Sequence, residues 1–361
     1  MSSGSPFFRD NRSMTSYSFL RPWLFCLDPE SAHNIALGSM DRANALGLLK
    51  HFVPPPVLDP RQFCGITVKN PVGLAAGLDK DGKHIDALAR LGFGFLEIGT
   101  VTPLPQPGNP KPRMFRLTEA QAIINRMGFN NDGVDACVSR VKQSQYWQSG
   151  GIIGMNIGKN AGTPIERAAD DYVIAMKKVY EVASYITVNI SSPNTKNLRA
   201  LQGETMLRAL LGSIDAARTE LSDQYGLRKP LFLKIAPDLD AADITLIADL
   251  LLEFTIDAVI ATNTTIERTA VSHLNHGHET GGLSGAPVRL LSNQVIASLK
   301  EHLGDRIPII GVGGILSGED AVEKITAGAS LVQLYSGLIY RGPELIRECA
   351  LALQKRVNLG L

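Results

Sequence analysis

Beyond residue 71 the chain repeats one pattern, a short apolar run followed by a longer stretch with apolar residues at helical spacing. Short runs that end in Gly, Asn, Thr or Ser are typical of buried strands, and stretches such as 165–183 and 241–254 are typical of amphipathic helices. Eight runs occur, at 72–75, 95–99, 152–157, 185–190, 231–235, 258–262, 307–312 and 331–335. Eight strand–helix units predict an α/β fold, a parallel (β/α)8 or TIM barrel.

Residues 15–53 carry a different pattern, which predicts a small N-terminal domain. Large apolar side chains between Leu20 and Leu27 share one helical face. Asp28 and Pro29 then end this helix and start a second one, because Asp is a favoured N-cap and Pro suits the first helical position. We expect a pair of amphipathic helices. They could anchor the protein on a membrane surface or simply cap the bottom of the barrel.

The remaining segments divide the chain further. Residues 1–14 predict a flexible tail of no assigned role, and Met14 is an alternative start. The three prolines at 54–56 predict a stiff linker, so residues 54–71 should lead to the bottom of the barrel. Residues 72–361 then form the barrel itself.

Composition excludes several classes of function. With 36 basic and 35 acidic residues the net charge is +1, which gives no general attraction to nucleic acid. No apolar run approaches the roughly 20 residues of a spanning helix. The four cysteines form no CxxC pair, and His273, His276 and His278 lie in a loop without a fixed scaffold, so we expect no metal site. Nothing requires a second chain, and whether the protein is a monomer stays open.

The ends of the predicted strands are unusually polar. The carboxyl ends of barrel strands form the active site of this fold, and Thr100, Asn156, Asn189, Lys234 and Thr262 all fall there. A lysine that ends a Leu/Ile strand points into the barrel mouth, where it is costly without an anionic partner. A flavin whose reduced ring is an anion would be such a partner.

Glycines after the last two strands indicate a phosphate. Residues 311–314 read GVGG and residues 335–337 read YSG. Loops at these places of a barrel commonly bind phosphate through backbone N–H groups. Neither segment fits the GxGxxG pattern of a Rossmann site.

Two further segments bring amides and hydroxyls together. NISSPNT at 189–195 offers two asparagines and two serines after the fourth strand, with no histidine near enough in sequence to suggest a hydrolase triad. NRMGFN at 125–130 lies in an insertion after the second strand and could grip a planar ring through paired donors and acceptors.

Together these strings resemble the dihydroorotate dehydrogenase family from about Phe19 to the end. The motifs are GLAAGLDKDG at 73–82, NRMGFNN at 125–131, NIGKN at 156–160, NISSPNT at 189–195, LKIAPDL at 233–239, ATNTT at 261–265, GGLSG at 281–285 and GVGGI at 311–315. By position, the resemblance implies FMN contacts at Ala76, Gly77, Thr100, Asn156, Asn189, Lys234, Thr262, Gly285, Gly314, Tyr335 and Ser336. It implies dihydroorotate contacts at Lys80, Asn125, Arg126, Met127, Gly128, Phe129, Asn189, Asn194, Asn263 and Thr264.

The resemblance also implies a mechanism and a class. Ser192 would be the catalytic base that accepts a proton from C5 of dihydroorotate while hydride passes from C6 to FMN, in the fourth step of pyrimidine synthesis. Family classes that reduce fumarate or a nicotinamide carry cysteine here and lack the helical pair. This chain therefore resembles the quinone class, in which His33 and Arg116 would lie near the quinone head. The implied location is peripheral, on the cytoplasmic side of a bacterial inner membrane.

Three rival functions are weighed against this one. Another FMN barrel oxidoreductase is disfavoured by the asparagines at 125, 189, 194 and 263. A barrel isomerase or lyase without redox chemistry would lack the yellow colour of bound FMN. A membrane-associated scaffold without catalysis is disfavoured by the intact polar strand ends.

Overall fold

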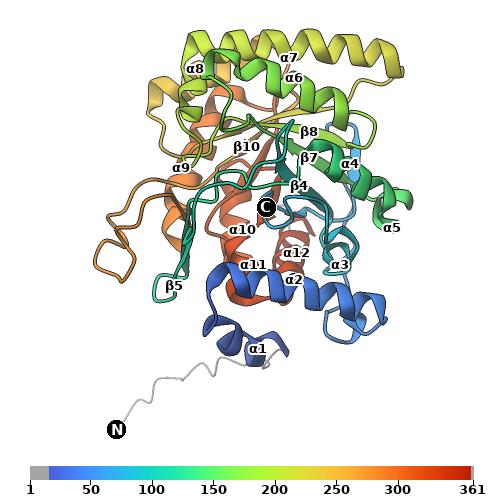
Figure 1. The fold of residues 1–361 in the computed structure, drawn as a ribbon, viewed down its shortest axis with the longest axis vertical. Helices are drawn as coiled ribbons and strands as arrows, with labels where there is room; N and C mark the ends of the chain where they lie inside the picture. Colours follow the sequence, from blue (N-terminus) through green and yellow to red (C-terminus); the bar gives the residue numbers. More distant parts are fainter. Residues whose placement is uncertain (1–15, 359–361) are drawn as a thin grey trace.

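The computed structural model describes residues 16–358, so the predicted tail at 1–14 lies outside the described residues. Eight parallel strands close into a barrel in the order β10-β12-β13-β3-β4-β7-β8-β9 (Figure 1). They are β3 (Val72–Leu74), β4 (Phe95–Val101), β7 (Ile153–Ile157), β8 (Tyr185–Asn189), β9 (Leu231–Ile235), β10 (Ala258–Ala261), β12 (Ile309–Val312) and β13 (Leu331–Leu334). Each coincides with one predicted run, which confirms the (β/α)8 barrel.

Helices surround the barrel and bury their apolar faces against it. They are α3 (Ile85–Ala89), α4 (Val134–Gln143), α5 (Gln145–Gln148), α6 (Ala168–Val179), α7 (Glu204–Tyr225), α8 (Ala241–Glu253), α9 (Arg289–Leu303), α10 (Gly318–Thr326), α11 (Ser336–Arg341) and α12 (Glu344–Asn358). Short 3-10 turns cover Leu49–His51, Ile165–Arg167, Leu198–Gln202 and Ala286–Val288. Helix α8 illustrates why these segments form helices. Asp240 and Asp243 form a capping box at its start, and Ile247 and Leu251 on its apolar face are buried.

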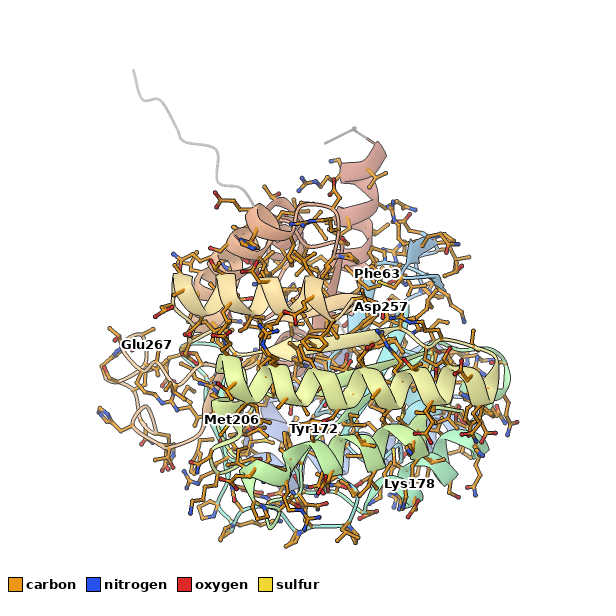
Figure 2. All side chains as sticks on the ribbon, turned by 90° about the horizontal axis from the view of Figure 1, so that it is seen from above. Phe63, Tyr172, Lys178, Met206, Asp257 and Glu267 are labelled. Atoms are coloured by element: carbon orange, nitrogen blue, oxygen red, sulfur yellow. The ribbon has the colours of Figure 1, made fainter. Side chains whose placement is uncertain are left out.

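A small hairpin of β1 (Arg61–Phe63) and β2 (Ile66–Val68) closes the amino-terminal end of the barrel. Phe63 lies beside Asp257, the residue before β10, and packs edge-on against Phe232 at 5.7 Å between ring centroids (Figure 2). The thiol of Cys64 donates a hydrogen bond to the Asp257 carbonyl, 3.2 Å away. The hairpin therefore covers the end of the barrel opposite to the carboxyl ends of the strands.

Aromatic rings fill the lumen above this hairpin. Phe95, Tyr185 and Phe232 point inward from three strands and are buried. Gly73 lies on the strand next to that of Phe95, and Gly154 on the strand next to that of Tyr185, and a Cβ at either glycine would collide with the neighbouring ring. Glycine is thus required at the two positions that these rings approach. Because the rings fill this end of the barrel, a ligand can bind only at the other end.

Two insertions meet at that other end. Strands β5 (Met114–Leu117) and β6 (Ala122–Asn125) follow β4, and β11 (Gly282–Gly285) follows β10. They pair as an antiparallel sheet in the order β11-β6-β5. This sheet joins loops that are about 160 residues apart and forms one wall of the site.

The predicted helical pair is present as α1 (Ser16–Phe25) and α2 (Pro29–Ala45), with Asp28 as the N-cap of α2. The pair packs on the carboxyl-terminal end, where α1 contacts α11 and α2 contacts α3 and β5 (Figure 1). The alternative of a cap on the barrel bottom is therefore wrong. No helix within residues 16–358 is long and apolar enough to cross a membrane.

Polar contacts fasten this pair to the barrel. Glu30 accepts two hydrogen bonds from the buried guanidinium of Arg113, at 3.1 and 2.7 Å. The hydroxyl of Tyr17 donates to the Ile339 carbonyl at 2.5 Å, and Arg21 donates to the Tyr340 carbonyl at 2.9 Å. The pair is thus docked on the barrel and not merely tethered by the proline linker.

Candidate active site

A cavity of about 1020 Å³, part of it open to solvent, occupies the carboxyl-terminal end of the barrel. Its walls come from seven barrel strands or the loops after them and from the β5–β6–β11 sheet. Most predicted site residues line it, namely Ser192, Ala76, Gly77, Thr100, Asn189, Lys234, Thr262, Gly285, Gly314, Tyr335, Ser336, Lys80, Asn125, Met127, Gly128, Phe129, Asn194, Asn263 and Thr264. The fold thus gathers residues that are up to 260 positions apart in sequence.

Asn156 and Arg126 are not among the lining residues. Asn156 lies behind the wall, where its side-chain oxygen accepts hydrogen bonds from the Thr100 hydroxyl at 2.5 Å and the Asn189 amide at 3.3 Å. It therefore orients two residues that do line the cavity. The side chain of Arg126 lies outside, because its guanidinium pairs with Glu279 at 2.7 Å and stacks 4.6 Å from the Phe115 ring centroid.

The charge of the cavity suits an anionic ligand. Among the described residues that line it, Lys80 and Lys234 are cationic and none is acidic. Burial lowers the pKa of Lys80 to about 8, so a carboxylate nearby would stabilise its charged form. Lys234 already has a protein partner, the carboxylate of Glu97 at 3.7 Å. From the sequence we expected that Lys234 needs the negative charge of a ligand. The structure corrects this expectation, because the buried Glu97 already supplies a negative charge.

The glycines after β12 adopt the backbone expected of a phosphate loop. Gly313 has φ +118° and Gly314 has φ +76°, a region that other residues rarely adopt. Both line the cavity, and a Cβ on Gly314 would also collide with Arg289. On the facing strand β11, Ser284 accepts a hydrogen bond from Ser336 at 2.8 Å.

Ser192 lies in the segment after β8, and its side chain is 6% exposed. Its hydroxyl oxygen accepts a hydrogen bond from the backbone N–H of Asn194 at 3.2 Å. Thr195, three residues on, has a buried hydroxyl that finds no partner within the described part of the chain. Ser192 is therefore shielded from bulk water.

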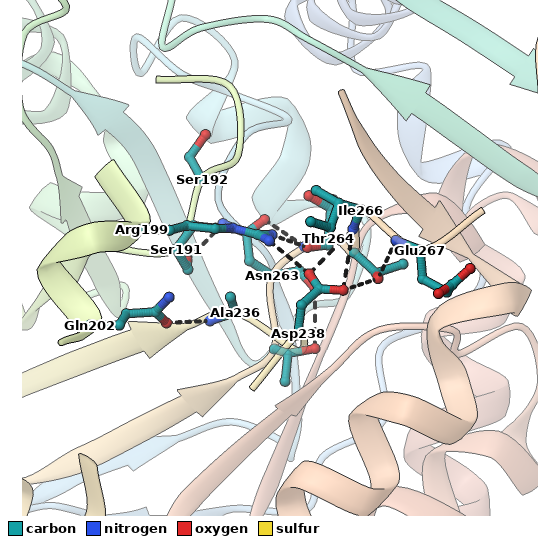
Figure 3. Close-up of polar contacts among 12 residues, drawn as sticks. Ser191, Ser192, Arg199, Gln202, Ala236, Asp238, Asn263, Thr264, Ile266 and Glu267 are labelled. Atoms are coloured by element: carbon teal, nitrogen blue, oxygen red, sulfur yellow. Dashed lines mark hydrogen bonds and ion pairs between the residues drawn. The ribbon is translucent and has the colours of Figure 1, made fainter. Parts of the chain in front are cut away.

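A network of hydrogen bonds and an ion pair holds the segment after β8 in place (Figure 3). Arg199 donates to the Ser191 carbonyl at 3.0 Å and to the Thr264 carbonyl at 2.7 Å, and pairs with Asp238 at 2.7 Å. Asp238 in turn accepts from the hydroxyl of Thr265. Ser192 points away from this network in Figure 3. The segments after β8, β9 and β10 are thus tied together, which sequence reasoning did not predict.

A second cavity of about 750 Å³ lies between the helical pair and the barrel. Its lining is largely apolar, with Leu24, Phe25, Leu37, Met40, Leu78, Leu91, Met114, Ile123, Leu338 and Ile339. We call it the apolar groove. Both residues predicted for a quinone, His33 and Arg116, line it. Burial, with the nearby charge of Lys80, lowers the pKa of His33 to about 3, so this ring is neutral at physiological pH.

The two cavities adjoin. Gly77 lines the barrel cavity and Leu78 lines the apolar groove, and the same division separates Gly337 from Leu338. Consecutive residues of the loop after β3 and of helix α11 thus form a partition between a polar site and an apolar one. Ligands in the two cavities would be close neighbours.

Sequence reasoning missed Glu97 and Gln333, which lie inside the barrel. Gln333 lines the cavity, and its carbonyl oxygen is buried without a hydrogen-bond partner among the described residues, as is the Thr264 hydroxyl. Orphaned acceptors of this kind fit a ligand with N–H or O–H donors. The available signal was a charged or amide residue within an otherwise apolar strand.

The fold and the two cavities define a class of protein, a (β/α)8 barrel with a polar, cationic cavity beside a largely apolar one. A family profile described as dihydroorotate dehydrogenase matches residues 60–357. The chain is 74% identical over 339 residues to a dihydroorotate dehydrogenase (quinone) of Polynucleobacter asymbioticus, covering 94% of this chain and 98% of that one. It is 63% identical to a relative with the same description from Herminiimonas arsenicoxydans, covering 94% and 97%.

Solved structures agree. DHODH of Eimeria tenella in complex with ferulenol is 38% identical, with a TM-score of 0.84 and 92% of both chains covered. The ligand-free form gives a TM-score of 0.83, with 92% of this chain and 96% of that one covered. The chain therefore belongs to the dihydroorotate dehydrogenase family, flavin-dependent oxidoreductases that oxidise dihydroorotate in pyrimidine biosynthesis.

Proposed function

We propose that this protein oxidises (S)-dihydroorotate to orotate with FMN in the barrel cavity and transfers the electrons to a quinone in the apolar groove. The observation that carries the proposal is the partition at Gly77–Leu78 and Gly337–Leu338. A polar site for substrate and an apolar site for acceptor share one wall. This arrangement suits a ping-pong reaction in which one ligand reduces a cofactor and another oxidises it.

The residues of the barrel cavity fit FMN. Gly314, Tyr335 and Ser336 lie where backbone N–H groups can bind the phosphate, while Lys234 and Asn189 lie deeper and can contact the ring. The side-chain carbonyl of Gln333 has no partner among the described residues, so it can accept a hydrogen bond from an N–H group of the flavin ring. Bound FMN supplies a hydride acceptor for the C6 hydrogen of the substrate.

Ser192 is the proposed base for the C5 proton. A serine hydroxyl is a weak base in water, so it needs a dry site and a group that takes the proton onward. The 6% exposure of Ser192 supports the first condition. Thr195, whose hydroxyl has no partner among the described residues, is the proposed group for the second. Lys80 would bind the substrate carboxylate, and the amides of Asn125, Asn194 and Asn263 would bind its ring.

The outer face of the helical pair suits a membrane surface. Phe19, Leu20, Trp23 and Leu27 are 58, 57, 77 and 42% exposed, a cluster that water alone does not favour. An amphipathic helix with this face lies in the interfacial plane of a bilayer. We infer peripheral binding to the cytoplasmic side of a bacterial inner membrane, with the apolar groove open to quinone from the lipid.

Anaerobic mixing of the purified protein with dihydroorotate tests the proposal. The bound flavin should lose its visible absorbance, and a lipophilic quinone should restore it. A colourless protein without FMN by mass spectrometry, or a flavin that dihydroorotate leaves oxidised, would overturn the assignment.

A further inference from the structure

The carboxylate of Glu97 lies at the centre of a buried polar cluster beneath the barrel cavity. Glu97 belongs to β4, and its side chain is fully buried. One oxygen accepts a hydrogen bond from the Asn156 amide at 2.8 Å and lies 3.7 Å from the Lys234 ammonium. The other accepts from the Gln333 amide at 2.7 Å and from the Tyr185 hydroxyl at 3.2 Å.

These four partners come from four other strands, so the cluster crosses the whole lumen. It lies between the aromatic rings that fill the lower barrel and the cavity above, which Lys234 and Gln333 line. A buried carboxylate is costly unless donors and a cation surround it, and here both are present. Glu97 does not line the cavity, so it touches no ligand there.

The cluster decides which way the Gln333 amide faces. Because its NH2 group donates to Glu97, its carbonyl oxygen must point elsewhere, and that oxygen is buried without a partner in the described chain. Burying an acceptor without a hydrogen bond is unfavourable, so we expect a donor on the ligand to bind this oxygen. The oxidised flavin ring carries a single N–H, at N3.

The cluster also places a negative charge beside Lys234, which partly offsets the positive charge of this lysine. A cation near the ring favours the reduced, anionic flavin, and an anion 3.7 Å from that cation opposes it. Burial and the Glu97 carboxylate hold the pKa of Tyr185 well above its usual range, so the phenol remains a donor to Glu97.

We infer that Glu97 is a positioning residue that turns the Gln333 carbonyl toward the flavin N3–H and offsets part of the Lys234 charge, thereby lowering the reduction potential of the flavin. This inference rests on the proposed binding of FMN. A merely structural glutamate that fills the lumen would leave the potential unmoved.

The test compares the flavin potential of the holoenzyme with that of Glu97→Gln, a change that keeps the shape and removes the charge. With Lys234 no longer offset, the ratio of reduced to oxidised flavin at a given potential should rise roughly tenfold. For a two-electron couple this corresponds to about 30 mV upward. Thr187→Val is the matched control, because Thr187 is equally buried inside the barrel but its hydroxyl contacts no partner in the described chain.

A second variant tests the acceptor separately. Gln333→Met should weaken FMN binding about two- to tenfold, the range of one hydrogen bond, and should shift the resonance of ¹⁵N-labelled N3 in the bound flavin. A wild-type potential or a lower one in Glu97→Gln would overturn the inference. If Glu97→Gln does not retain flavin, an unchanged affinity and N3 resonance in Gln333→Met would overturn it instead. Failure of the proposed function would show differently, as wild-type protein without flavin.

Discussion

The barrel cavity and the apolar groove lie side by side but are built in opposite ways. In the barrel cavity, polar side chains from many strands are fixed by hydrogen bonds before any ligand arrives, as Asn156 fixes Thr100 and Asn189. In the apolar groove, one wall is a docked helical pair held in part by the ion pair of Glu30 and Arg113. The comparison teaches that the proposed reaction depends on barrel strands that are bonded to one another. Access of the acceptor to the apolar groove depends instead on the helical pair, which can be loosened without changing the strands.

The largest expected effect separates the two regions by half-reaction. Ser192→Ala should slow flavin reduction by dihydroorotate by about 10²–10⁴-fold, because a general base contributes that much. Reoxidation by quinone should stay within about twofold, since Ser192 does not line the apolar groove. Stopped-flow absorbance measures both steps. Equal slowing of both, or of neither, would remove Ser192 as the specific base.

The second prediction loosens the helical pair alone. Glu30→Gln leaves the buried Arg113 guanidinium without its counterion, at a cost of about 3 kcal/mol. Urea denaturation should show this loss, together with slower quinone reduction and a nearly normal rate of flavin reduction. The double variant Glu30→Gln/Arg113→Met should recover part of the stability. A loss below about 0.5 kcal/mol would mean that the ion pair does not dock the helices.

The third prediction concerns the exposed face of α1. Leu20→Ser should weaken binding to anionic lipid vesicles roughly tenfold, because one leucine no longer enters the bilayer interface. Leu227→Ser is the matched control, since Leu20 and Leu227 are 57 and 55% exposed but only Leu20 lies on the helical pair. Co-sedimentation with vesicles gives both affinities. Similar losses in the two variants would show that this face has no special role.

The smallest expected effect is a pH dependence confined to the apolar groove. Burial lowers the folded pKa of His33 to about 3, below the unfolded value near 6.5. Between these values the unfolded chain binds a proton that the folded chain does not, so stability falls as pH drops below about 6.5. Thermal denaturation of His33→Gln should show a shallower decline from pH 6.5 to 5 than wild type. Parallel curves would contradict a neutral, half-buried His33.

Much of the barrel could be read from the chain. The eight strands, the two N-terminal helices and the cap at Asp28 follow from apolar periodicity and local hydrogen bonding, which are short-range properties. Four residues that line the cavity, Thr100, Asn189, Lys234 and Thr262, were also predictable from the fold, because it places the end of every barrel strand at one rim. The lining residues of the insertions, such as Asn125, were expected only from the family resemblance. For Arg126 the chain gave no sign of Glu279, more than 150 residues away, which directs the guanidinium out of the cavity.

What the sequence by itself determined is therefore the set of elements and the edge of the barrel on which chemistry lies. Only the tertiary structure decided that Glu97 pairs with Lys234, that Arg199 ties three segments together, and that the helical pair packs on the active-site end. The physical reason is distance along the chain. Periodicity reports the local environment of each residue, but a buried charge is stabilised by a partner that only closure of the barrel brings within a few ångströms.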